Sequence, residues 1–131
     1  MNGYLTGTAS LARNGIKTSL PAQPPAAALF DLAVLCRAPA RLIRAGIGDA
    51  LCRTTAQADW LLAHYLRDAP YCDTPYLLQI EYEPCLFSHA AAMAGGDPDA
   101  IVALTRLLVL AGLGMVIAGS SAPASMGEHS I

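Results

Sequence analysis

The spacing of hydrophobic and polar residues changes from short segments near the start of the chain to helical repeats beyond Pro39. Residues 8–13 and 16–20 are two short segments that flank Asn14-Gly15. Asn-Gly is the preferred pair for a type I′ turn, because both of its central residues need a positive φ. These segments therefore predict a β-hairpin.

A proline-rich stretch and an apolar run follow the hairpin. Pro21, Pro24 and Pro25 break regular structure. Residues 26–35 (AAALFDLAVL) are almost wholly apolar, which predicts one buried strand. Asp31 interrupts this run and would need a polar partner if it were buried.

The remainder of the chain reads as helices. Pro39 suits a first helical turn, and Gly46-Ile47-Gly48 predicts a break just before Asp49. Further helices are expected over residues 54–67, 76–93 and 100–118, with a bend or break in the second one at Pro84. A loop at 70–75 separates the first two, and Gly95-Gly96 with a capping Asp97 separates the last two. Residues 121–123 end the last helix. Within residues 54–67, the apolar face is expected to comprise Ala58, Leu61, Leu62 and Tyr65.

Composition indicates that much of the surface has a partner. Charged residues make up 14% of the 131 residues, against about 25% in typical soluble domains. The partner could be a missing section of chain, another subunit or lipid. With a net charge of −2 and no basic stripe, nucleic acid is not expected to be a partner.

Residues 100–119 are long enough to span a bilayer. Arg106 lies within this segment, no Lys/Arg cluster flanks it, and its glycines suit close packing in a helical core. We therefore expect a core helix and no membrane span, with a small membrane protein as an alternative. Four cysteines without zinc-type spacing predict buried, reduced thiols in a cytosolic protein.

Asp49 and His129 are the candidate metal ligands. The glycines before Asp49 could aim its carboxylate into a cleft, although an Asp after Gly is commonly a helix N-cap. His129 follows Glu128 near the end of the chain, where a lone His is often simply solvated. A catalytic zinc needs three protein ligands, and His64 and His89 lie in helical patterns with apolar neighbours. The chain therefore lacks one ligand.

Two further segments could contribute to a site. Residues 2–8 (NGYLTGT) are small, polar and glycine-bearing, so they could lie against a nucleotide or a sugar phosphate, or form a plain N-terminal loop. Asp59-Trp60 holds the single Trp of the chain, which is expected to be structural. Near its end, the sequence has small residues at 119–125 and then Glu128-His129. From this pattern we expect the chain to be part of a larger protein.

These segments, in this order, resemble sn-glycerol-1-phosphate dehydrogenases of the iron-containing alcohol dehydrogenase and dehydroquinate synthase-like superfamily. The resemblance covers essentially the whole chain. It rests on Asn2-Gly3-Tyr4, residues 20–25, residues 38–43, Gly46-Ile47-Gly48-Asp49, residues 55–60, and residues 119–125 with Glu128-His129.

The resemblance implies a mainly α fragment of a two-domain fold. Residues 1–35, a hairpin plus one strand, would end a nucleotide-binding α/β domain, and residues 36–131 would be an incomplete helical metal and substrate domain. The full-length parent is implied to be a cytoplasmic, homo-oligomeric enzyme of phospholipid metabolism.

The resemblance also implies site roles. Asp49 and His129 would bind Zn²⁺ or another divalent metal, with a third ligand beyond Ile131. Asn2 and Asp49 would contact the substrate, where the family usually has Asp in place of Asn2. Thr6 would contact the nicotinamide nucleotide.

The implied reaction is the NAD(P)H-dependent reduction of dihydroxyacetone phosphate to sn-glycerol 1-phosphate. The isolated chain is expected to be inactive and to expose apolar surface. The family often has Arg at the position of Ala122 and Gly-Ser at the positions of Met126-Gly127. These differences from the family leave the identity of the substrate open. The alternatives are a related glycerol dehydrogenase, a 3-dehydroquinate synthase-like enzyme, or a non-catalytic helical interaction module.

Overall fold

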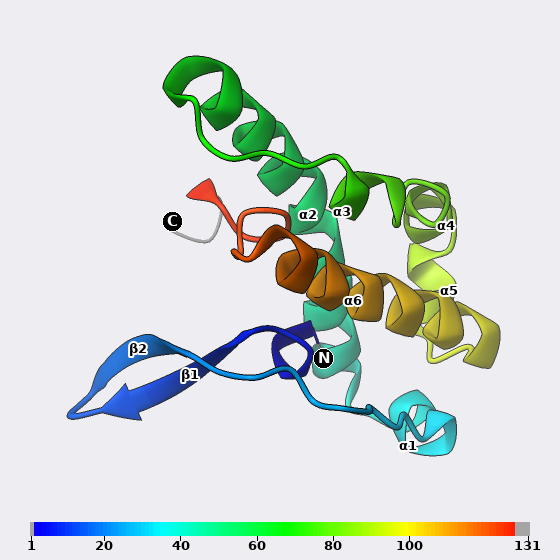
Figure 1. The fold of residues 1–131 in the computed structure, drawn as a ribbon. Helices are drawn as coiled ribbons and strands as arrows, with labels where there is room; N and C mark the ends of the chain where they lie inside the picture. Colours follow the sequence, from blue (N-terminus) through cyan, green and yellow to red (C-terminus); the bar gives the residue numbers. More distant parts are fainter. Residues whose placement is uncertain (1, 128–131) are drawn as a thin grey trace.

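The computed structural model describes residues 2–127 and is mainly helical (Figure 1). A short 3-10 helix, η1 (Asn2–Tyr4), precedes the strands β1 (Thr8–Arg13) and β2 (Ile16–Pro21). The helices that follow are α1 (Leu32–Cys36), α2 (Ala40–Arg67), α3 (Thr74–Leu77), α4 (Glu83–Ser88), α5 (Ala90–Ala94) and α6 (Pro98–Ala118).

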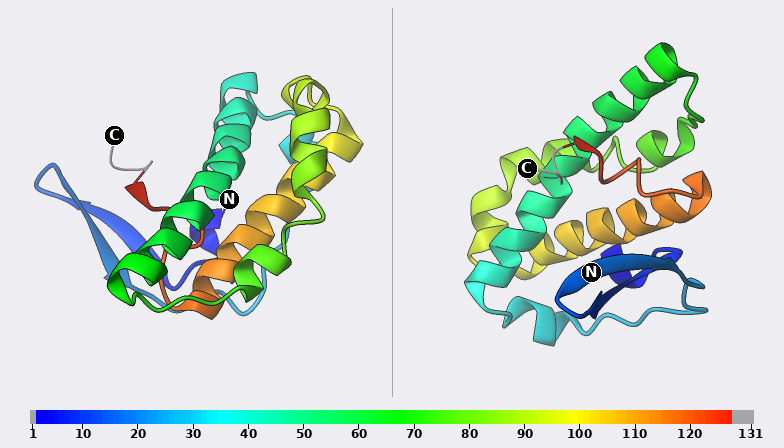
Figure 2. Two further views of the ribbon diagram at one scale, coloured as in Figure 1. Left: turned by 90° about the horizontal axis from the view of Figure 1, so that it is seen from above. Right: turned by 90° about the vertical axis from the view of Figure 1, so that its left-hand side faces the viewer.

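The two long helices, α2 and α6, cross and form the centre of the molecule (Figure 2). Helices α1, α3, α4 and α5 pack around α6, and the hairpin lies to one side. The core forms where apolar residues of α2, α4, α5 and α6 meet, and it comprises Ile43, Ile47, Ala50, Leu86, Met93, Ala100, Ile101, Leu104, Leu107 and Leu108.

The predicted hairpin is confirmed. Strands β1 and β2 pair antiparallel, with Arg13 opposite Ile16 across the turn. Asn14 and Gly15 have φ values of 53° and 76°, as a type I′ turn requires. Local turn chemistry therefore fixed this element without help from the core.

The buried strand predicted over residues 26–35 is wrong. Residues 22–34 are exposed, Leu29 to 98%, and the short helix α1 begins at Leu32. Asp31 is the N-cap of α1, since its carboxylate accepts a hydrogen bond from the backbone N–H of Val34 at 3.2 Å. Asp31 thus has its polar partner in the backbone, and the only sheet in the described part of the chain is the hairpin.

The break predicted at Gly46-Ile47-Gly48 is also wrong, because α2 runs through it. Each glycine in a helix interior costs about 1 kcal/mol relative to Ala, but burial of apolar neighbours offsets that cost. Ile43 and Ile47 are buried on either side, and a Cβ on Gly46 would lie 3.5 Å from Leu108 of α6. Asp49 therefore sits inside a helix and is not an N-cap.

The helix predicted over residues 76–93 is three short helices, α3, α4 and α5. The break at Pro84 is confirmed, since Pro84 lies in the first turn of α4. Helix α3 begins at Thr74, inside the predicted loop at 70–75. His89 lies between α4 and α5 and is exposed, so its prediction as a residue within a helix is wrong.

The ends of α6 agree with the sequence prediction. The Asp97 carboxylate accepts from the Ala100 N–H at 3.0 Å, and Gly119 ends the helix with φ at 66°. Among the described residues, α6 is the one helix long and apolar enough to cross a membrane. Its inner face packs in the core, from Ala100 and Ile101 to Gly112 and Gly114. One such helix does not indicate a membrane span.

Candidate functional site

A cavity of about 580 Å³ opens where η1, α1, α2 and α6 meet. Its walls are mostly apolar, with Leu42, Ile101 and Leu108 among them. Asp49 is the one carboxylate in the lining, and Tyr4 and Thr105 add hydroxyl groups. An apolar cavity with few polar groups is typical of small-molecule sites.

Asp49 reaches this cavity from α2 and is partly buried. It lies on the face of α2 that also carries Leu42 and Ala45, and these two residues line the same cavity. Asp49 also makes an interaction within the molecule. The position suits a residue that contacts a ligand in the cavity.

Asn2 and Asp49 are brought to the same part of the molecule. Asn2 begins η1, which packs against α6, and Tyr4 at the end of η1 lines the cavity together with Asp49. The two predicted substrate-binding positions are therefore on elements that border one cavity. Their contact with substrate stays a prediction.

Thr6 lines a second cavity of about 200 Å³, between the N-terminal segment and the end of α6. Gly119, Ser120 and Ser121 line its other side. The Thr6 side chain is buried, and its hydroxyl donates to a backbone carbonyl, with the Thr8 oxygen at 3.0 Å and the Gly3 oxygen at 3.3 Å. These bonds indicate that the Thr6 hydroxyl holds the backbone of residues 3–8 in its conformation. Contact of Thr6 with a nicotinamide nucleotide stays a prediction.

The chain after α6 turns back onto α2. The Gln57 amide nitrogen donates to the Pro123 carbonyl at 2.9 Å. A Cβ on Gly127, the last described residue, would lie 3.2 Å from an oxygen of Asp59. Asp59 is about 15 Å along the helix axis from Asp49, at 1.5 Å per residue. His129 lies outside the described residues.

The described residues supply one ligand of the predicted metal site. Asp49 offers a carboxylate oxygen, which suits a divalent cation. Within residues 2–127, no three His, Cys, Asp or Glu side chains are grouped so that they could hold a metal ion. A site at Asp49 would therefore depend on residues outside this part of the chain.

The other histidines and the cysteines have structural contacts. His64 Nδ1 lies 2.9 Å from the Ala69 carbonyl, and His89 Nδ1 lies 2.8 Å from the Ser88 hydroxyl. All four cysteines are partly buried and none forms a disulfide. Trp60 is buried, donates to the Pro70 carbonyl at 2.8 Å and contacts Tyr71, which confirms its structural role.

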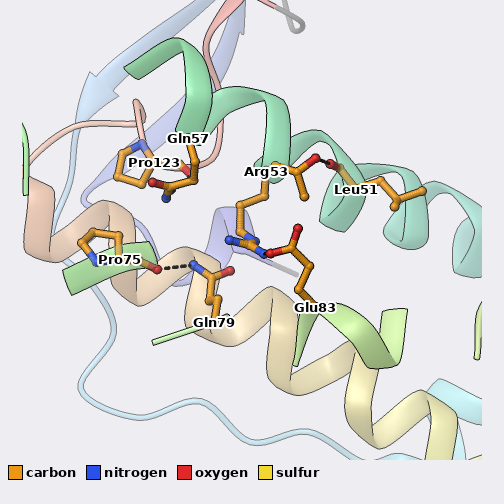
Figure 3. Close-up of polar contacts among 8 residues, drawn as sticks. Leu51, Arg53, Gln57, Pro75, Gln79, Glu83 and Pro123 are labelled. Atoms are coloured by element: carbon orange, nitrogen blue, oxygen red, sulfur yellow. Dashed lines mark hydrogen bonds and ion pairs between the residues drawn. The ribbon is translucent and has the colours of Figure 1, made fainter. Parts of the chain in front are cut away.

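A buried polar cluster was missed by the sequence analysis. Arg53 and Gln57 of α2 are buried facing Gln79 and Glu83, and Arg53 forms an ion pair with Glu83 at 2.8 Å (Figure 3). The spacing of buried positions along α2 could have indicated this cluster. Positions 43, 47 and 50 face inward, and the same helical spacing continues to 53, 57 and 60.

Comparison with known proteins supplies a class for the chain. No protein-family model matches it. It is 36% identical over 129 residues to glycerol-1-phosphate dehydrogenase (NAD(P)+) of Geobacillus thermodenitrificans, covering 98% of this chain and 32% of that protein. Proteins of the same name from Halalkalibacterium halodurans and Pyrococcus furiosus are each 34% identical, over 98% of this chain and over 32% and 37% of their own lengths.

These relatives are dehydrogenases, so the chain is related to oxidoreductases. More particularly, its resemblance to the glycerol-1-phosphate dehydrogenases is confirmed over nearly all of its residues. The chain spans about a third of the length of the curated relatives it matches.

Proposed function

We propose that this chain is a section of an NAD(P)-dependent, metal-dependent sn-glycerol-1-phosphate dehydrogenase of the dehydroquinate synthase-like superfamily. The observation that carries the proposal is the similarity to proteins of that name over 98% of the chain. Residues 1–35 would close the nucleotide-binding domain, and residues 36–131 would belong to the helical domain. The parent would be a cytoplasmic homo-oligomer.

The proposed reaction is the reduction of dihydroxyacetone phosphate to sn-glycerol 1-phosphate. When bound, NAD(P)H supplies the hydride and a divalent metal such as Zn²⁺ supplies Lewis-acid chemistry at the ketone oxygen. Asp49 and His129 would be metal ligands, with a third ligand from sequence beyond this chain. The partly buried carboxylate of Asp49 at the 580 Å³ cavity supports its part in this set.

The chain's own residues would bind and orient the substrate. Asn2 and Asp49 would contact it at the cavity that η1 borders, and the apolar walls contributed by α2 and α6 would exclude water around it. Thr6 would contact the nucleotide at the cavity beside the end of α6, which its position next to Gly119 and Ser120 supports.

The isolated chain is proposed to be inactive. It spans about a third of its relatives, and its described surface exposes large apolar side chains, including Leu29, Tyr65 and Leu66 at 98%, 74% and 72%. Exposed apolar surface of this kind marks a region that contacts other protein. The non-catalytic interaction module remains the second candidate on this observation.

The test is a chimera with the Geobacillus thermodenitrificans dehydrogenase, in which the matching segment is replaced by this chain. The chimera is expected to oxidise NADH with dihydroxyacetone phosphate, whereas the isolated chain is not. Asp49→Asn should lower kcat/KM by more than about 100-fold, because even groups behind the ligands are worth about 10–100-fold. Asp99→Asn, at an exposed position in the first turn of α6, is the matched control and should change little.

The outcomes separate the candidates. Turnover of dihydroxyacetone without its phosphate would favour a glycerol dehydrogenase. Formation of 3-dehydroquinate would favour a dehydroquinate synthase-like enzyme. A folded, soluble chimera without any of these activities would favour the interaction module. Full activity in Asp49→Asn would remove Asp49 from the site.

A further inference from the structure

Three buried polar side chains lie between α2 and the α3–α4 segment (Figure 3). None of them lines either cavity of the candidate site. Arg53 and Gln57 are 2% and 7% exposed, and Gln79 is completely buried. Glu83, which pairs with Arg53, is 23% exposed. Buried polar groups are stable only when their hydrogen bonds are made.

Each of the three side chains makes one of its hydrogen bonds. Arg53 Nη2 donates to Glu83 Oε2 at 2.8 Å. Gln57 and Gln79 donate from Nε2 to the carbonyls of Pro123 and Pro75, both at 2.9 Å. Because a carbonyl only accepts, these two bonds fix which end of each amide is nitrogen.

Four buried polar atoms then have no partner among the described residues: Arg53 Nε, Arg53 Nη1, Gln57 Oε1 and Gln79 Oε1. Two of these are donors and two are acceptors. A bound anion would serve only the guanidinium, and a bound cation only the amide oxygens. Water donates and accepts, and buried water typically makes about three hydrogen bonds to such groups.

We propose that at least one ordered water molecule is bound in this cluster, accepting from the Arg53 guanidinium and donating to the amide oxygens of Gln57 and Gln79. This site does not depend on the proposed function. It connects α2 with the α3–α4 segment through the Arg53–Glu83 pair and, through the Gln57–Pro123 bond, with the chain that follows α6. The water would hold the Gln57 amide in the orientation that fixes this returning loop.

The test is NMR detection of water next to the Arg53 side chain in the ¹⁵N-labelled protein. We expect a cross-peak between the Arg53 Nε–H proton and water, with the sign that marks a long-lived complex. The internal control is the Trp60 indole N–H, which is buried and donates to Pro70 at 2.8 Å, so it should show no such cross-peak. Gln79→Met should at least halve the Arg53 cross-peak, whereas Gln23→Met, at an exposed position, should leave it unchanged.

A crystal structure gives an independent reading that does not require any variant to fold. It should place a water within about 2.7–3.2 Å of Arg53 and of a Gln57 or Gln79 oxygen. A direct bond from Arg53 to either amide oxygen, or a solute other than water, would overturn the proposal. So would the absence of the Arg53 cross-peak, or its full retention in Gln79→Met.

Discussion

The hairpin and the α2–α6 pair are held together in different ways. The hairpin forms from its ladder and its Asn14-Gly15 turn, and the side chains of Leu11 and Ile16 are 53% and 68% exposed. Helices α2 and α6 instead share a buried core. An isolated two-stranded hairpin is marginally stable in water, whereas core burial supplies most of the stability of a helical domain. A substitution should therefore have different consequences in the two regions.

Removing a core side chain should have the largest effect. Leu107→Ala, at 2% exposure in α6, is expected to lower the free energy of unfolding by about 3 kcal/mol. Leu11→Ala, the same change in the hairpin, should stay within about 0.5 kcal/mol. Denaturant unfolding followed by circular dichroism measures both.

Equal losses in the two leucine variants would break the comparison. They would mean that the hairpin unfolds together with the helices and shares their core. A small loss in both would mean that α6 is not packed in solution.

Two helix glycines sharpen the comparison within the α2–α6 pair. A Cβ on Gly114 of α6 would lie 3.0 Å from the Cβ of the buried Pro75, so Gly114→Ala should destabilise the protein by about 1–2 kcal/mol. A Cβ on Gly48 of α2 would meet nothing within 4 Å. Gly48→Ala should therefore stabilise by about 0.5–1 kcal/mol through helix propensity.

Thermal unfolding of the two glycine variants decides the point. A higher Tm in both variants would mean that helix propensity outweighs the contact with Pro75. Opposite shifts would confirm that α6 approaches α3 closely at this glycine.

Local signals in the sequence predicted several element boundaries. The Asn14-Gly15 turn, the Asp97 cap and the stop after α6 all depend on neighbouring residues, so a short stretch of sequence contains the information. The strand at 26–35 failed because an apolar run alone does not distinguish a buried strand from an exposed loop and helix. The predicted break at Gly46-Ile47-Gly48 was wrong because the packing of Ile43 and Ile47 outweighs the low helix propensity of the glycines.

The inward face of the second half of α2 was also predicted wrongly. Ala58, Leu62 and Tyr65 are exposed, while the polar Gln57 and the charged Arg53 are buried. The apolar residues of 54–67 favoured the face that is exposed. Only the helical spacing that continues from Ile43 and Ile47 indicated the face that is buried. The exposed apolar face is consistent with a chain that spans a third of its relatives.

The candidate site was predicted in part. Asp49 was selected from its glycine-rich context, and it does line the cavity of about 580 Å³ together with Tyr4. The reason given for its position, a break in the helix, was wrong. The metal and cofactor roles came from the resemblance, because ligands distant in sequence leave no local pattern.

A glycine in the hairpin turn offers a smaller, local effect. Gly15 has φ at 76°, so Gly15→Ala should weaken the hairpin by about 1 kcal/mol. The free energy of unfolding of the helices should change by less than about 0.5 kcal/mol. NMR chemical shifts of residues 8–21 report the hairpin, and circular dichroism reports the helices. A fall in helix stability as large as that of the hairpin would show that the two regions fold as one unit.

The smallest expected effect is a pH dependence within the helical region. Burial, and then the charge of Asp73, raises the pKa of Tyr71 above its usual 10.0. Since the folded state holds this proton more tightly than the unfolded state, the stability it contributes is complete below pH 10 and is lost as the pH rises through the folded pKa. Tyr71→Phe, which keeps the ring that packs on Trp60 at 4.7 Å, should lose less stability between about pH 8 and pH 11 than the unmodified protein. Tyr4→Phe, at an exposed position that does not act on Tyr71, is the control. Parallel pH curves for the protein and Tyr71→Phe would mean that this loop does not shield Tyr71 from water.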